Sequence, residues 1–189
     1  VAPGDFKFKD IDGNDTININ DRTYIGSPLP DFTYGLSLNA GYKIFDLSLL
    51  LTGSKGNDMV NPFKYYLYGY SFSNKAADLV GNYWTESNTN AEYARVGINK
   101  NDNYDRFSDF YVEDASYLRI KNITLGVNLP AKIIDRLGMS KFRLYVSAQN
   151  VFTFTKYTGM EPESGNVGWN PQPLELGVDR GTYPHSRIF

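Results

Sequence analysis

The clearest pattern in the chain lies between residues 32 and 54, where apolar and polar side chains alternate. In FTYGLSLNAGYK (32–43) every even position carries Phe, Tyr, Leu or Ala, and every odd position is small or polar. The alternation resumes in FDLSLLLTGS (45–54), with Leu50 as the exception. Side chains of a strand point alternately to two faces, so the pattern predicts two strands that each have one apolar face. Their short connection predicts a tight hairpin.

Two later runs have the same period, but each contains a slip. FRLYVSAQNVFTFT (142–155) keeps apolar residues on even positions except at residues 150–151. SYLRIKNITLGVNLP (116–130) alternates cleanly from Ile123 onwards, whereas its earlier apolar residues lie on the opposite parity. A β-bulge near Asn122, or an exit of the strand from the apolar layer there, would account for the change.

The length of these runs limits the fold class to two alternatives. They reach ten to thirteen residues, whereas strands of soluble proteins usually have about five or six, and a tilted strand needs roughly nine to eleven to cross a bilayer. Their aromatic residues lie mostly near the strand ends, as in the girdles of a transmembrane barrel. A large soluble β-sandwich with the apolar parity inside is the alternative.

The connections between the runs fall into two length classes. The hairpin turn is short, and PAKIIDRLGM (130–139) predicts a short helix that begins after Pro130 and ends at Gly138. The other connections are far longer than loops of compact domains and are rich in Asn, Gly, Asp and Tyr. Short turns at one rim and long loops at the other are typical of an outer-membrane barrel. Within the long middle loop, SNKAADLVGNYW (73–84) predicts a helix capped by Ser73 or its neighbour.

Composition removes several classes of function. The net charge is −2 and the charges are dispersed, which argues against nucleic acid or an anionic membrane surface as a partner. There is no cysteine and a single histidine, His185, so thiolate catalysis and zinc–thiolate or HExxH chemistry are excluded. Glu161 and Glu163 could be imagined as a glycosidase pair, but carboxylates in loops are usually just solvated. We therefore expect no enzyme.

The stretch DIDGNDTININD (10–21) concentrates oxygen ligands ahead of the first strand. Its spacing matches positions 1, 3, 5, 7, 9 and 12 of an EF-hand loop, which predicts a Ca²⁺ site. The predicted metal ligands are Asp10, Asp12, Asn14, Thr16 through its carbonyl, Asn18 and Asp21. Asp15 replaces the turn glycine of position 6, and position 12 is the shorter Asp21 rather than Glu. A solvated turn rich in Asx residues is the alternative.

Several blocks of the sequence resemble the C-terminal part of SusC/RagA-type TonB-dependent outer-membrane transporters of Bacteroidetes. Each block alone is modest, but their order and spacing are specific. The blocks are PGDFKFKDIDGNDTININDRTYIGSPLPDFTYGLSLNAGYKIFDLSLLLTGSKGNDMVN, NYWTESN, VEDASYLRIKNITLGVNLP, FRLYVSAQNVFTFTKYTGMEPE and GVDRGTYPHSRIF.

The resemblance implies an all-β fold: the C-terminal strands of a large transmembrane barrel of about 22 strands with long extracellular loops. This chain cannot close such a barrel alone, so we expect a fragment of a longer protein. The expected segments are an outer loop with the acidic motif (1–31), a hairpin (32–54), a long outer loop (55–115), two strands joined by a short helix (116–155), an outer loop (156–184) and the start of the last strand (185–189).

The resemblance also implies a function in the cell outer membrane. The family takes up large solutes, often glycans or oligopeptides, with a SusD-like surface lipoprotein as lid and with TonB acting through the missing N-terminal part. It often carries a calcium-type loop like residues 10–21. Its barrel is surrounded by outer-membrane lipid. A soluble, Ca²⁺-stabilised β-sandwich that binds carbohydrate or mediates adhesion is the alternative function.

Aromatic residues in or beside the long loops are candidate contacts for substrate or lid. Such side chains stack on sugar faces and anchor interfaces, although they also pack loops internally. The candidates are Tyr68, Tyr70, Trp84, Tyr157 and Trp169.

Overall fold

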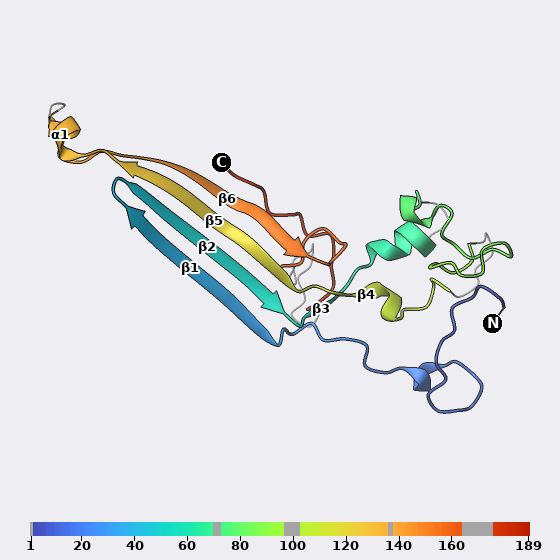
Figure 1. The fold of residues 1–189 in the computed structure, drawn as a ribbon. Coiled ribbons are helices and arrows are strands. Elements are labelled where there is room, and N and C mark those ends of the chain that lie inside the picture. Colours follow the sequence, from blue (N-terminus) through green and yellow to red (C-terminus); the bar gives the residue numbers. More distant parts are fainter. Residues whose placement is uncertain (1, 70–72, 97–102, 136–137, 164–175) are drawn as a thin grey trace. The chain divides into compact units, whose positions relative to one another are not determined.

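The chain forms two compact units. The computed structural model describes residues 2–69, 73–96, 103–135, 138–163 and 176–189 (Figure 1). We call Ser27–Met59 with Asp114–Phe189 the sheet unit, and Val1–Gly26 with Val60–Glu113 the loop unit.

The sheet unit contains one four-stranded antiparallel sheet in the order β1-β2-β5-β6 (Figure 1). Its strands are β1 (Phe32–Tyr42), β2 (Phe45–Lys55), β5 (Tyr117–Asn128) and β6 (Arg143–Thr155). These long strands and the two-residue hairpin turn confirm what the alternation predicts. The predicted helix is reduced to one turn, α1 (Ala131–Ile134), which follows Pro130.

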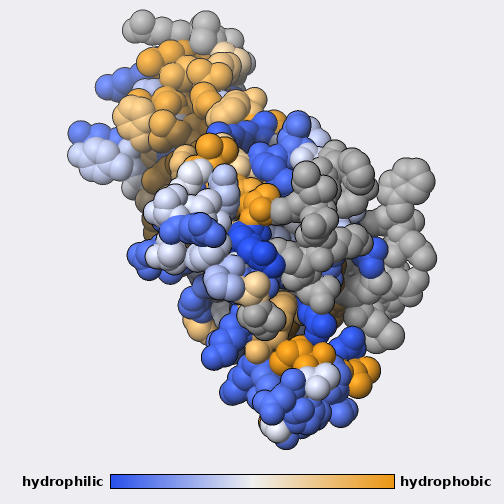
Figure 2. Space-filling model, turned by 90° about the vertical axis from the view of Figure 1, so that its right-hand side faces the viewer, coloured by the Kyte–Doolittle hydropathy of each residue, from blue (hydrophilic) through white to orange (hydrophobic). Residues whose placement is uncertain are grey.

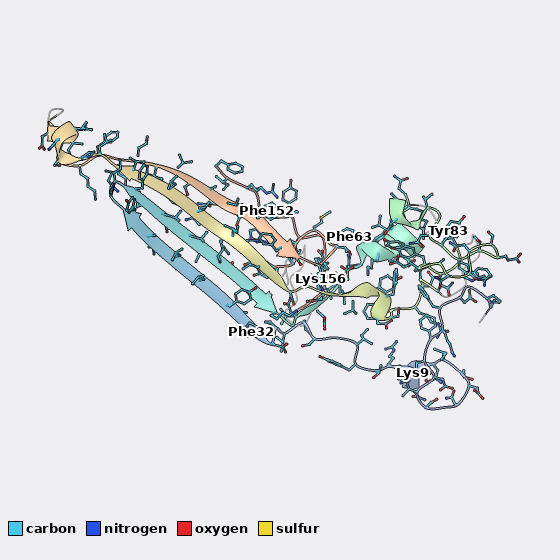
Figure 3. All side chains as sticks on the ribbon, in the orientation of Figure 1. Lys9, Phe32, Phe63, Tyr83, Phe152 and Lys156 are labelled. Atoms are coloured by element: carbon cyan, nitrogen blue, oxygen red, sulfur yellow. The ribbon has the colours of Figure 1, made fainter. Side chains whose placement is uncertain are left out.

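One face of this sheet is apolar across all four strands. In one row Leu38 pairs with Leu49, Leu49 with Ile123, and Ile123 with Ala148. The rows on either side also bring apolar side chains together: Leu36, Leu51, Ile120 and Phe152 in one, Ala40, Leu47, Leu125 and Val146 in the other. We call this surface the apolar face. Phe32, at the start of β1, and Phe152, on β6, are labelled in Figure 3.

The apolar face is open to its surroundings. Leu36 is 57% exposed and Val146 is 72% exposed. In the upper part of the space-filling view, hydrophobic residues gather at the end of the sheet unit that carries α1 (Figure 2). A β-sandwich would cover this face with a second packed sheet. Among the described residues no second sheet packs on it, so the sandwich alternative is wrong for this chain.

A bulge explains the slips in the two later runs. Ile120 pairs with Phe152 but Asn122 pairs with Gln149, so two residues of β6, Asn150 and Val151, lie opposite Lys121. Asn150 has φ 51°, the left-handed conformation that Asn tolerates better than most residues. The β-bulge expected near Asn122 is confirmed, and it restores the parity of the apolar face on both sides.

The opposite face of the sheet, which we call the polar face, carries small and hydrogen-bonding side chains. Thr124 Oγ1 donates to Ser147 Oγ at 3.1 Å, and Ser147 Oγ donates to Asn122 Oδ1 at 3.2 Å. Near the hairpin end, Arg143 pairs with Asp46 across the sheet, with Nη2 2.5 Å from Oδ2. Each strand thus has one apolar and one polar side, and the sheet has two chemically different faces.

The remaining elements are short. The strands β3 (Asp58–Val60) and β4 (Val112–Asp114) form a two-stranded sheet, and single turns occur at η1 (Ile19–Asp21), η2 (Tyr65–Gly69), η3 (Ala77–Leu79) and η4 (Asp109–Tyr111). No helix among the described residues is long and apolar enough to cross a membrane.

The helix expected over residues 73–84 is wrong. Only η3 forms there, and no side-chain hydrogen bond caps it. The hydroxyl of Ser73, the expected cap, instead donates to the Tyr66 carbonyl. Gly81, at φ 77°, turns the chain away two residues after η3 ends.

Each unit has its own small core. In the sheet unit Met59, Ala115 and Tyr157 pack together. In the loop unit the ring of Tyr104 meets those of Phe6 and Phe110 edge to face, with centroids 5.0 and 5.3 Å apart. These aromatic contacts hold together segments that are about 100 residues apart in the sequence.

Candidate functional site

The acidic loop, residues 10–21, folds around its own carboxylates in the loop unit. Lys9, labelled in Figure 3, marks its beginning. The carboxylate of Asp10 accepts hydrogen bonds from the backbone N–H groups of Gly13 and Asp15, both at 2.7 Å. This carboxylate therefore gathers the first half of the loop, as an Asx-type turn does.

The carboxylate of Asp21 closes the other half of the acidic loop. It accepts hydrogen bonds from the backbone N–H groups of Asn18, at 2.7 Å, and Ile11, at 2.8 Å. These two backbone donors hold the pKa of Asp21 below its usual value, because they favour the charged form. Asn18 and Asp21 also form a capping box at η1. Asp21 is therefore an anion whose position is fixed from two sides.

Three predicted ligands meet at one place. Asp10, Asp12 and Asp21 each bring a carboxylate oxygen within 4.8 Å of the other two. Ligands of one Ca²⁺ ion lie at about 2.3–2.6 Å from it, so two of them are at most about 5 Å apart. The three oxygens therefore have the separation that a shared cation requires.

The other predicted ligands take part in hydrogen bonds inside the loop. Asn14 Nδ2 donates to Asp12 Oδ2 at 2.8 Å, and Asn14 Oδ1 accepts from the Thr16 N–H at 2.8 Å. Asn18 Nδ2 donates to the Thr16 carbonyl at 2.9 Å. One amide, that of Asn14, thus donates to a carboxylate of the cluster. Asn14, Thr16 and Asn18 would have to release or share these bonds to bind a metal.

Asp15 stands where the EF-hand pattern has the glycine of position 6, and it makes the same kind of turn. Its φ is 60°, in the left-handed region that the glycine of position 6 normally occupies. Asp adopts this conformation more easily than most non-glycine residues. Its side chain is exposed and lies outside the cluster of three carboxylates. The turn at position 6 is therefore made without glycine.

A cavity of about 920 Å³ lies beside the acidic loop within the loop unit. Residues 7–11, 17–25 and 105–109 contribute its walls. Arg106 joins two of these walls, because its Nη1 donates to the Ile17 carbonyl at 3.2 Å and its guanidinium lies 5.7 Å from the ring centre of Phe8. Sequence reasoning missed Arg106, since no local pattern relates it to a loop some 90 residues earlier.

The candidate aromatic residues of the loop unit pack against neighbouring groups. Tyr68 stacks on Tyr93 with ring centres 4.9 Å apart, and both hydroxyls donate to Asp78 Oδ2, at 2.8 and 2.7 Å. These two hydroxyls hold the pKa of Asp78 below its usual value. Trp84 lies so close to Gly4 that a Cβ there would come within 2.5 Å of the indole ring.

Among the other candidates, Tyr157 belongs to the core of the sheet unit. It is 6% exposed, and its hydroxyl donates to Asp179 Oδ2 at 2.7 Å. Tyr70 and Trp169 lie outside the described residues.

Sequence comparison relates the chain to bacterial receptors along almost its whole length. It is 39% identical over 189 residues to TonB-dependent receptor P3 of Formosa agariphila, covering 99% of this chain and 18% of that protein. It is 32% identical over 187 residues to TonB-dependent receptor SusC of Bacteroides thetaiotaomicron, covering 96% of this chain and 17% of SusC. The chain thus spans less than a fifth of these curated relatives. No family model matches it.

Structure comparison gives a consistent result. The chain resembles a chain of the RagAB peptide importer in its closed-closed state, with a TM-score of 0.73 and 30% identity over 94% of this chain and 19% of the other. The open-open state of the same importer gives a TM-score of 0.67 and 30% identity over 84% of this chain. The open four-stranded sheet is therefore the fold of a segment of a much larger β-protein.

Proposed function

Because the chain belongs to the TonB-dependent receptors of the SusC/RagA type, we propose that it forms part of the barrel wall of an outer-membrane importer. The observation that carries this proposal is the exposed apolar face, which continues through every strand of the sheet. A face of this kind is unfavourable in water but matches the hydrocarbon of a bilayer. The polar face then lines the interior of the barrel.

The orientation of the sheet can be tested in the full-length receptor in native membranes. Cysteines placed at Leu38 and Asn39 are neighbours in β1 but point to opposite faces. We expect Leu38→Cys to react with a lipid-soluble maleimide and to resist a water-soluble one. Asn39→Cys, as the matched control, has the reverse preference if water fills the interior. The opposite pattern would overturn the barrel assignment.

We also propose that the whole protein imports a large solute, a glycan or an oligopeptide, together with a SusD-like lipoprotein and driven by TonB. The proposal is supported by SusC and by the RagAB peptide importer, the relatives described above. Uptake of fluorescent oligosaccharide and peptide mixtures by cells that carry the receptor should stop when either TonB or the lipoprotein is deleted. Uptake that persists in both deletions would contradict it.

Tyr68 and Trp84 are proposed contacts for the substrate or the lid. Both lie in the loop unit on the long connection between β3 and β4. Tyr68 shares Asp78 with Tyr93, so its ring orientation is fixed before any partner arrives. Replacement of Trp84 by Ala should weaken uptake, whereas replacement by Phe should keep most of it. Equal losses would assign the indole to packing against Gly4 alone.

We further propose that the acidic loop binds Ca²⁺ through Asp10, Asp12 and Asp21, with Asn14, Thr16 and Asn18 completing the site. The support is the convergence of the three carboxylates and the left-handed turn at Asp15. Calorimetric titration of Ca²⁺ into the chelated full-length receptor should show one site that is lost in the Asp10→Ala, Asp12→Ala double variant. Asp15→Asn is the control and should keep the site. Equal heats from all three proteins would make the loop a solvated turn.

A further inference from the structure

The polar face of the sheet carries a buried arginine near its long-loop end. Arg119 lies on β5 between Thr52 of β2 and Thr153 of β6, and it is 2% exposed. Burial of a guanidinium is costly unless its hydrogen-bond donors are satisfied by acceptors of opposite charge. The groups that accept hydrogen bonds from Arg119 therefore indicate the role of this buried charge.

Those partners come from two segments that are distant in the sequence. Nε donates to Thr153 Oγ1 at 2.9 Å, which fixes the guanidinium to the neighbouring strand. Nη1 donates to Glu163 at 2.6 Å, and Nη2 donates to Glu161. Nη1 also lies 2.9 Å from Nδ1 of His185. The fork of the guanidinium thus holds residues 161–163 and residue 185 at the same place on the sheet.

Glu161 connects the two segments to each other. It is 2% exposed, its Oε2 accepts the backbone N–H of His185 at 3.2 Å, and its Oε1 accepts the backbone N–H of Glu163 at 3.1 Å. A second connection lies nearby, because the Tyr157 hydroxyl donates to Asp179, which is fully buried and also accepts the backbone N–H of Gly181 at 2.9 Å. The two segments are therefore fastened to each other as well as to the strand.

A metal ion is a poor explanation for this cluster. Glu161, Glu163 and His185 have ligand atoms close enough to share an ion. However, the Arg119 guanidinium already pairs with both carboxylates, and Lys121 Nζ lies 3.4 Å from Glu163 Oε1. An added divalent cation would meet these two fixed positive charges.

We propose that Arg119 is a positioning residue, a latch that holds residues 157–163 and His185 folded against the polar face of the sheet. The latch itself rests on the contacts above and does not depend on the proposed function. If the polar face lines the passage of an importer, the latch also fixes how much of that passage these two segments fill.

Hydrogen–deuterium exchange of the full-length receptor in detergent micelles tests the latch. In Arg119→Met the buried carboxylate of Glu161 loses its guanidinium, and we expect amide exchange in residues 157–163 and at His185 to become about tenfold faster or more. Exchange in the β1–β2 hairpin should not change. Lys121→Met is the matched control, since this side chain is 40% exposed and pairs with Glu163 at 3.4 Å; it should have a small effect.

Graded variants keep the test decisive if Arg119→Met fails to assemble. Arg119→Lys keeps the charge but loses the fork, so it should give an intermediate effect. Glu161→Gln should loosen the segments more than Glu163→Gln, because the Glu161 side chain is 3% exposed and that of Glu163 is 29% exposed. Equal effects of Arg119 and Lys121 substitutions, or faster exchange in the hairpin as well, would overturn the latch.

An uptake assay on the same variants separates the latch from its role in import. Faster exchange together with altered uptake supports both parts of the inference. Faster exchange with normal uptake leaves the latch in place and rejects its control of the passage. A receptor that imports nothing in its wild-type form, yet shows the exchange difference, rejects the proposed function and keeps the latch.

Discussion

Gly53 shows how closely single residues are fitted within the sheet. A Cβ at this position would lie 2.4 Å from the Tyr117 carbonyl and 2.4 Å from the ring of Tyr34, whose hydroxyl donates to that carbonyl at 3.0 Å. We expect Gly53→Val to displace the ring and to destabilise the full-length receptor by about 1–3 kcal/mol, as overpacking does. Urea unfolding measures this, with Gly35→Ala as control, because a Cβ there meets nothing closer than 3.7 Å. Equal midpoints would contradict the close fit.

The carboxyl group of Glu161 gives the latch a pH dependence. Burial raises the pKa of Glu161, but hydrogen bonds from His185, the Glu163 N–H and Arg119 outweigh it and lower the pKa from 4.5 to about 2. A lowered folded-state pKa contributes stability that is complete above pH 4.5 and is lost as the pH falls towards 2. A polarity-sensitive dye on Met160→Cys should report opening in that window. The same curve in Glu161→Gln would assign the transition to another group.

At the level of elements, the alternation of side chains was enough to predict the strands but not the contacts of the loops. Period two determines the faces of a strand locally, so the hairpin and even the bulge at Lys121 are visible in the sequence. The helix expected from Ser73 failed because its cap hydrogen-bonds elsewhere. The partners of Arg119 are 34 to 66 residues away, and only the folded chain brings them together.

The acidic loop lies between these two cases. Its ligand spacing could be recognised in the sequence because all its carboxylates are within twelve residues. The structure brings Asp10, Asp12 and Asp21 together as this spacing predicts. The left-handed turn at Asp15 could not be predicted with the same ease, because the pattern calls for glycine at that position and aspartate, although it tolerates this conformation, adopts others as well. Local sequence thus predicts which groups are near one another more readily than their geometry.

The apolar face of β1 predicts a position-dependent response to charge. Leu38 is near the middle of its strand and pairs with Leu49. Leu38→Arg in the full-length receptor should cost about 2–4 kcal/mol if this position is near the bilayer midplane, because a charge on the lipid face must leave water. Asn39→Arg on the polar face is the control and should cost much less. The amount of folded barrel, seen as the heat-sensitive band on a gel, measures both; equal amounts would count against a lipid-facing Leu38.

At the level of the whole chain, the sheet leaves one apolar face and most of its two edges, at β1 and β6, without a partner among the described residues. The apolar face is uncovered, with Leu36, Leu144 and Val146 each more than half exposed. Among the residues that the structure describes, the far edge of β6 pairs at Gln149 alone, where the backbone exchanges two hydrogen bonds with Ile188. Uncovered apolar surface and unpaired strand edges both favour association with other chains in water.

The exposed apolar face and strand edges determine how the chain behaves in water. When the 189-residue chain is produced alone in aqueous buffer, we expect it to aggregate rather than to form a monodisperse β-protein, because the sheet exposes one apolar face and two edges. Sedimentation and light scattering measure this directly. A triple variant with Ser at Leu36, Leu38 and Leu49 is the control, and it should aggregate less because the centre of the apolar face becomes polar. A monomeric, cooperatively folding wild-type chain would contradict the lipid-facing sheet.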